Sequence, residues 1–106
     1  MKISTLDLQY VPAEVVLRDS GTTPNISTDT VQMAFPVASV QPAGGDWKAA
    51  TWETDATGDP PRYLARCLVG PAGTVTLAAG LYDVWVKVTH SPELPVLKAR
   101  GQLEVF

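Results

Sequence analysis

His90 is the only histidine of the chain, and histidine is the residue best suited to acid–base catalysis near neutral pH. Ser91 follows it directly and Glu93 lies close behind, so this segment contains the three residue types of a hydrolytic triad. A triad works only when the base is held by its partners in a site that is shielded from water. Neighbouring residues in an exposed turn seldom meet that condition, and we predict that this protein is not an enzyme.

Cys67 is the only cysteine, which excludes an intramolecular disulfide. It alternates with Tyr63, Ala65 and Val69, a spacing that is typical of a small buried apolar residue in a strand. The alternative is a reactive thiol, which needs a basic environment that lowers its pKa. Arg66 is adjacent but points to the opposite face of the predicted strand, so the buried residue is the favoured interpretation.

Two other segments contain residue types that can bind ions. Glu53, Asp55 and Asp59 offer carboxylate oxygens, but they lack the regular alternate spacing of a calcium loop, so we interpret them as solvated acids. The run 70–73 is too short for a phosphate loop and has no lysine, which predicts a turn. A structural zinc site needs about four ligands, more than one Cys and one His can supply. We therefore predict no cofactor and no metal ion.

The composition is that of a folded protein, with 45% hydrophobic and 18% charged residues in a chain of 106. The net charge is −3 and the eight Lys and Arg residues are scattered, so the basic surface of a nucleic-acid-binding protein is not expected. Asp7 and Gln9 interrupt the N-terminal segment before the apolar core of a signal peptide forms. No run approaches the roughly 20 apolar residues of a membrane helix. We predict a protein made in the cytoplasm that binds neither nucleic acid nor membrane.

Short segments rich in β-branched and aromatic residues lie between the nine prolines and eight glycines, and none carries the apolar stripe of a helix. This pattern predicts one all-β sandwich over residues 1–106, with about seven to nine mainly antiparallel strands and no helix longer than a turn. Pro12 has no N–H to donate, which places it on an edge or at a bulge. The segments expected to form strands are 3–11, 14–18, 31–35, 47–53, 62–69, 74–77, 81–89 and 94–106.

The segment 81–89 has the clearest alternation of the sequence. One set of its side chains is aromatic or β-branched and is expected to face the core, while the other set is mostly polar and is expected to face outward. The inward set is Tyr82, Val84, Val86 and Val88, and the outward set includes Asp83, Trp85 and Lys87. Tyr82 follows a turn at Gly80, and this resembles a tyrosine corner, in which the hydroxyl bonds back across the turn. A tyrosine that is merely half buried is the alternative.

Trp85 on this outward face has two interpretations. A neighbouring strand or loop covers it, or it anchors a protein–protein contact, since tryptophan is favoured at interface hot spots. Trp47 and Trp52 are five positions apart, so in a regular strand they point to opposite faces and at least one lies outside the core. Phe106 at the C-terminus is a docking residue or a cap on the core. The candidate interface residues are Trp85, Asp83, Lys87, Trp52, Trp47 and Phe106.

The order of strand, turn and tryptophan segments resembles that of a known class of proteins. The segments that carry the likeness are 31–35, 46–48, 52–53, 66–77, 80–88 and 91–96. They resemble small immunoglobulin-like β-sandwich proteins that are encoded among the virion genes of tailed phages and prophages of high-GC Gram-positive bacteria. The likeness covers most of the chain, and its motifs are structural and not catalytic.

The resemblance implies a non-enzymatic structural protein of the virion, at the head–tail connection (the neck) or on the head surface. Its implied partners are other virion proteins, namely capsid, neck or tail subunits, in a symmetric assembly with several copies of this chain. The alternative is a carbohydrate-binding or host-recognition module of the phage tail, which would stack exposed aromatic rings on sugars. The open sheet edges expected at Pro12 and at residues 102–106 could pair with another subunit.

Overall fold

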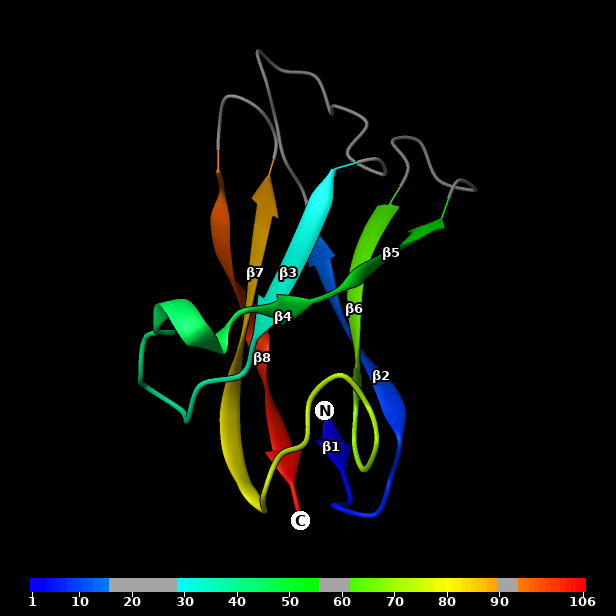
Figure 1. Ribbon diagram of the computed structural model, residues 1–106, viewed down its shortest axis with the longest axis vertical. Helices are drawn as coiled ribbons and strands as arrows, with labels where there is room; N and C mark the ends of the chain where they lie inside the picture. Colours follow the sequence, from blue (N-terminus) through cyan, green and yellow to red (C-terminus); the bar gives the residue numbers. More distant parts are fainter. Residues whose placement is uncertain (16–28, 56–61, 90–93) are drawn as a thin grey trace.

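The computed structural model describes residues 1–15, 29–55, 62–89 and 94–106, and it contains two β-sheets that face each other (Figure 1). The only helix in these ranges is the single 3-10 turn η1 (Gly44–Asp46), and no described helix is long and apolar enough to cross a membrane. The strands are β1 (Lys2–Ile3), β2 (Gln9–Val15), β3 (Thr30–Ala34), β4 (Lys48–Ala49), β5 (Thr51–Asp55), β6 (Arg62–Val69), β7 (Gly80–Thr89) and β8 (Val96–Val105).

The strand order identifies the type of sandwich. One sheet has the order β1-β8-β7-β3-β4 and the other has the order β2-β6-β5. Neighbouring strands are antiparallel except β1 and β8, which are parallel. In an immunoglobulin domain the third strand and the last two lie side by side in one sheet, and the second, fourth and fifth strands lie in the other. The chain has this topology, so the predicted immunoglobulin-like β-sandwich is confirmed.

The core lies between the two sheets and is built from the apolar residue at every second position. Val84, Val86 and Val88 of β7 are 4%, 2% and 0% exposed, as the alternation predicted. The same pattern buries the inward residues of β3 and β6. The largest buried side chains of the whole core include Met33, Leu103, Ile3, Val11 and Val15. Because each strand presents one apolar face, the two sheets exclude water only when these faces meet.

Three local predictions about the backbone are confirmed. The Tyr82 hydroxyl donates a hydrogen bond of 2.8 Å to the carbonyl oxygen of Ala78, so the tyrosine corner is present. Pro12 lies in β2, which is an edge strand, so its missing N–H does not interrupt a ladder on both sides. The turn predicted at residues 70–73 is also present, and Gly70 there has a φ of 141°.

Other strand predictions were wrong. Residues 3–11 do not form one strand, because β1 and β2 belong to different sheets. Residues 74–77 contribute only an isolated bridge between Val69 and Val75. The C-terminal half of β8 is no open edge, because β1 pairs with it at Glu104 and Val105. Residues 16–18 of the expected strand 14–18 lie outside the described part of the chain.

Candidate interaction surface

The outer face of the five-stranded sheet carries most of the candidate residues. The inward positions of β7 are taken by valines, so Trp85 and Lys87 project from the opposite face, away from the three-stranded sheet. In register, Trp85 lies opposite Lys98 of β8 and Ala34 of β3, and Lys87 lies opposite Val96 and Gln32. We call this surface the lysine face. It comprises Lys2, Trp47, Trp85, Lys87, Lys98, Glu104 and Phe106.

Asp83 was expected to face solvent here, and this expectation was wrong, because its side chain is 2% exposed. A register shift between Asp83 and Trp85 makes Asp83 and Val84 consecutive buried residues. The carboxylate accepts hydrogen bonds from Gln102 Nε2 at 3.0 Å and from the Ser39 N–H at 2.9 Å. Asp83 therefore holds neighbouring residues in place beneath the lysine face, and its own side chain is not available to a partner.

The hydrogen bond from Gln102, followed by the one from the Ser39 N–H, lowers the pKa of Asp83 below its ordinary value. The Lys98 ammonium, 3.3 Å from Oδ2, acts in the same direction, while burial opposes it. Ser39 has a φ of 70°, a left-handed conformation that costs roughly 1–2 kcal/mol outside glycine. The buried carboxylate thus holds the chain at Ser39 in a strained conformation over the sheet.

Trp85 combines features of both interpretations given above. It is half buried, and its Nε1 atom is buried without a hydrogen-bond partner among the described residues. Lys98 Nζ lies 5.9 Å from the centre of its ring, within the range of a cation–π interaction. Neighbouring groups therefore cover part of the indole, and the remainder is open to solvent. Whether that open part contacts another protein remains a prediction.

The prediction that Trp47 and Trp52 share a regular strand was wrong, because the chain changes sheet between β4 and β5. The consequence drawn from it, that one of the two lies outside the core, is confirmed. Trp52 packs against the core, its ring 6.3 Å from that of Tyr63, and its Nε1 donates to the Asp29 carbonyl oxygen at 2.8 Å. Trp47 is half buried, and Lys87 Nζ lies 4.4 Å from its ring centre.

Phe106 is 60% exposed, so it does not cap the core. It continues the outward side of β8, as Glu104 does, because Leu103 and Val105 are buried. Lys2 of β1 approaches both residues. Its Nζ lies 5.5 Å from the Phe106 ring centre and 3.3 Å from Glu104 Oε2. The C-terminal residue is thus an exposed aromatic group at one end of the lysine face.

A sugar-binding platform would need bare aromatic rings on this surface. The two tryptophans of the lysine face each have a lysine ammonium over one side of the ring, Lys87 over Trp47 and Lys98 over Trp85. These ammonium groups occupy space in which a sugar ring would stack. The observed geometry therefore gives the carbohydrate alternative no specific support.

Of the residues considered for chemistry, the structure places Glu53 beside Arg66 Nη1, 3.7 Å away, and Cys67 in the core. Cys67 is 1% exposed among apolar core residues, and its Sγ lies 3.5 Å from the Ala49 carbonyl oxygen. Burial raises the pKa of the thiol, which disfavours the reactive thiolate. His90, Ser91, Glu93 and Asp59 lie outside the described residues. Within the described ranges, no three His, Cys, Asp or Glu residues lie close enough to hold a metal ion.

We expect the Cys67 thiol of the native protein to react slowly with a thiol-specific reagent, because the reagent cannot reach the core without unfolding. Reaction with a chromogenic disulfide reagent, followed in native buffer and in rising denaturant, measures this. The rate should follow the unfolded fraction. Rapid stoichiometric modification in native buffer would instead point to a reactive cysteine.

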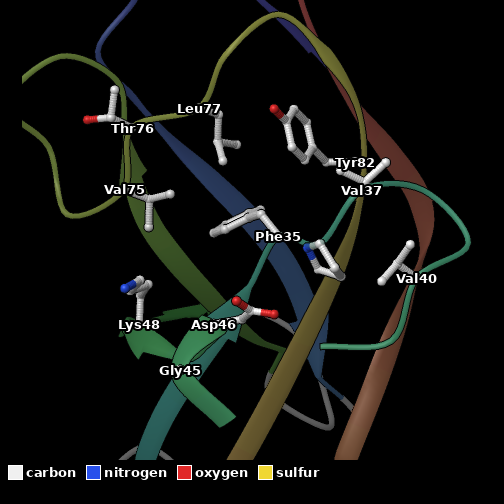
Figure 2. Close-up of a pocket in the computed structure, with 11 residues that line it drawn as sticks. Phe35, Val37, Val40, Gly45, Asp46, Lys48, Val75, Thr76, Leu77 and Tyr82 are labelled. Atoms are coloured by element: carbon white, nitrogen blue, oxygen red, sulfur yellow. The ribbon is translucent and has the colours of Figure 1, made fainter. Parts of the chain in front are cut away.

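Sequence reasoning missed a cavity of about 460 Å³ beside the lysine face (Figure 2). Phe35 lies in its middle, Leu77 and Tyr82 lie to one side, and Asp46 and Lys48 lie to the other. These residues come from segments that are distant in sequence, so no local pattern could have brought them together. Sequence reasoning also missed the roles of Lys98, Gln102 and Ser39 around Asp83. Comparison with known families, with curated proteins and with solved structures finds no match.

Proposed function

We propose that this chain is a non-enzymatic structural protein of a tailed-phage virion, present in several copies at the neck or on the head surface. The proposal takes its biological setting from the sequence resemblance described above. The observation that carries it is the lysine face, where Trp47, Trp85 and Phe106 stand partly open to solvent beside lysines. Aromatic residues are enriched at the centre of protein–protein interfaces, and tryptophan is common among the residues that dominate binding.

The strands and hydrogen bonds beneath this face make it suitable for binding another protein. Trp85 and the three lysines stand on strands, Trp47 lies directly before β4, and the bonds to Asp83 hold β7, β8 and the chain at Ser39 together. A surface that is rigid before binding loses little conformational entropy when a partner covers it.

Replacing Trp85 by alanine is expected to reduce incorporation of the chain into virions by about tenfold or more, because a buried tryptophan anchor is worth at least about 2 kcal/mol at an interface. The measurement is quantitative mass spectrometry of particles purified from the strain that encodes the chain, with Trp85→Ala in place of the wild-type copy. Wild-type particles should contain several copies of the chain.

Tyr10→Ala provides the matched control, since Tyr10 is a 46% exposed aromatic side chain on the outer face of the three-stranded sheet, on the other side of the core from the lysine face. It should enter particles at the wild-type level. Thermal unfolding of both variants separates loss of docking from loss of folding, and Trp85→Phe should recover part of the incorporation. The virion role is wrong if purified particles lack the wild-type chain. Trp85 is not the anchor if a folded Trp85→Ala variant enters particles normally.

A further inference from the structure

The cavity shown in Figure 2 has a largely apolar wall and two exposed valines at its rim. Phe35, Val75 and Leu77 line it, and the rim residues Val37 and Val40 are 60% and 53% exposed. A volume of about 460 Å³ is in the range of small-ligand sites, so the cavity has room for a leucine side chain. A concave apolar surface with exposed apolar residues beside it is typical of a site that binds a ligand or another protein.

Two charged residues, Asp46 and Lys48, lie on one side of this cavity (Figure 2). The Asp46 carboxylate accepts a hydrogen bond of 2.8 Å from the Ala43 N–H, which ties it to the start of η1. Lys48 has neither an ion pair nor an aromatic contact among the residues that the structure describes. A fitting occupant of the cavity would therefore combine an apolar side chain with a carboxylate that reaches the Lys48 ammonium.

The turn between β1 and β2 carries both of these groups. Leu6 in this turn is 86% exposed, more than any other large apolar residue of the described chain, and Leu8 is also exposed. Asp7 lies between them, and no described residue forms an ion pair with it. Its Oδ2 atom accepts the Ser4 N–H at 2.9 Å, and a carboxylate has further lone pairs that can accept a lysine ammonium. We call residues 4–8 the leucine knob.

Hydrogen bonds hold the leucine knob in one shape. The Asp7 N–H donates to the Ser4 carbonyl oxygen at 3.0 Å, and the Leu6 N–H donates to Ser4 Oγ at 3.2 Å. The turn 70–73 lies against the knob, since a Cβ at Gly73 would be only 3.0 Å from Leu8 Cδ1. A segment that is ordered before binding loses little conformational entropy when a partner covers it.

The exposed aromatic residues of the described chain fit the cavity less well. Phe106 adjoins Glu104, but the Glu104 carboxylate already pairs with Lys2 at 3.3 Å. Tyr10 has the guanidinium of Arg66 4.3 Å from its ring centre, so the charge beside it is positive. The leucine knob differs from both, because it joins a highly exposed apolar side chain to a carboxylate that takes part in no ion pair with a described residue.

We propose that the leucine knob of one copy of this chain inserts into the cavity of a second copy, where Leu6 packs against Phe35. The Asp7 carboxylate then lies beside the Lys48 ammonium. A chain does not fill its own cavity in this way, because Leu6 is exposed and is not among the residues that line it. Each copy offers one knob and one cavity, so the contact repeats and builds a ring if it closes or a filament if it does not. The biological use of this assembly rests on the virion role proposed above.

The test damages the knob in one variant and the cavity in another. Sedimentation velocity of the purified wild type should show concentration-dependent oligomers. Leu6→Ala should weaken association about tenfold or more, because it removes the apolar group that the contact buries. Lys48→Glu should weaken it about a hundredfold or more, because it places like charges opposite each other. At a concentration where neither variant associates alone, their mixture should form a mixed dimer and nothing larger, since only the Leu6→Ala cavity and the Lys48→Glu knob are intact.

Leu94→Ala and Lys87→Glu are the matched controls. Leu94 is another exposed leucine, Lys87→Glu changes the net charge as Lys48→Glu does, and neither control residue lines the cavity. Both controls should associate as the wild type does, and thermal unfolding verifies that every variant is folded. The proposal is wrong if the wild type stays monomeric, if folded Leu6→Ala or Lys48→Glu associates normally, or if the mixture fails to associate. It is also wrong if a control weakens association as much as the variant it matches.

These outcomes are separate from those of the virion test. A chain that is found in particles but stays monomeric when purified keeps its virion role and loses the contact between knob and cavity. A chain that associates through knob and cavity but is absent from particles keeps the contact and loses the virion role.

Discussion

Gly70→Ala is expected to lower the free energy of unfolding by about 4 kcal/mol, because it combines backbone strain with a backbone overlap. Gly70 has a φ of 141°, a conformation that side-chain-bearing residues rarely adopt. An added Cβ would overlap the Asp7 carbonyl oxygen and lie 2.8 Å from the Leu8 Cα atom. Both obstacles are backbone atoms, so no side-chain rotation relieves them.

Gly70 contacts several segments of the chain, so its replacement should affect more than its own turn. The Gly70 N–H donates to the Val75 carbonyl oxygen at 2.8 Å, and its own carbonyl oxygen accepts from the Gly73 N–H at 3.0 Å. The residue thus ties the end of β6 to the turn that follows and lies against the segment before β2. Displacing it would disturb the end of β6 and the segment that leads into β2.

Urea unfolding of wild type and Gly70→Ala measures the effect. Gly44→Ala is the control, since a Cβ at Gly44 meets nothing within 4 Å and its φ is not in the left-handed region. The control should change stability by less than about 0.5 kcal/mol. Equal stabilities of the Gly70 variant and the wild type would show that the close approach to Asp7 is not maintained in solution.

Asp83→Ala is expected to lower the free energy of unfolding by about 3 kcal/mol. The substitution removes the carboxylate that accepts two hydrogen bonds and pairs with Lys98. The Ser39 N–H and Gln102 Nε2 would lose a bond of 2.9 Å and 3.0 Å respectively. A hydrogen bond to a charged group contributes about 1.5–3 kcal/mol to stability. Urea unfolding gives the value, and Glu104→Ala is the control, since Glu104 forms an exposed ion pair worth less than about 1 kcal/mol.

The effect should depend on pH in a defined direction. Because the folded-state pKa of Asp83 lies below its unfolded-state value, the carboxylate stabilises the fold fully above about pH 4. That stabilisation is lost as the pH falls through the folded-state pKa. The stability difference between wild type and Asp83→Ala should therefore shrink in acid. A difference that is constant or grows as the pH falls would mean that the charged form of Asp83 is not the stabilising one.

Asp83→Ala also tests how the lysine face is organised. Without the carboxylate, Ser39 loses the bond that holds its left-handed backbone, and Lys98 loses one of its two neighbours while keeping Trp85. We expect Trp85 to become more exposed, seen as a red shift of tryptophan fluorescence in a variant that is still folded.

The alternation of apolar residues was sufficient to predict the inward faces of the strands. In β7, β3 and β6 every second side chain is apolar, and a shift by one residue would bury the polar set, so local sequence specifies which face meets the core. The tyrosine corner and the edge position of Pro12 were also predictable. Both depend on residues within one turn or one strand, where the backbone chemistry of Tyr and Pro acts locally.

The tertiary structure determined which outward-facing residues are exposed and which are covered. Asp83 is buried for two reasons: a register shift in β7 makes it a neighbour of another buried residue, and the chain at Ser39, 44 residues away, covers it. Trp47 and Trp52 are separated because the chain crosses from one sheet to the other at Ala50, which no period-2 pattern reports. The lysine face likewise combines β1, β7, β8 and the residue before β4. Sequence alone determined which side of each strand faces the core, because that choice is local. Only the packed structure determined which outward residues stay open to a partner, because distant segments cover the others.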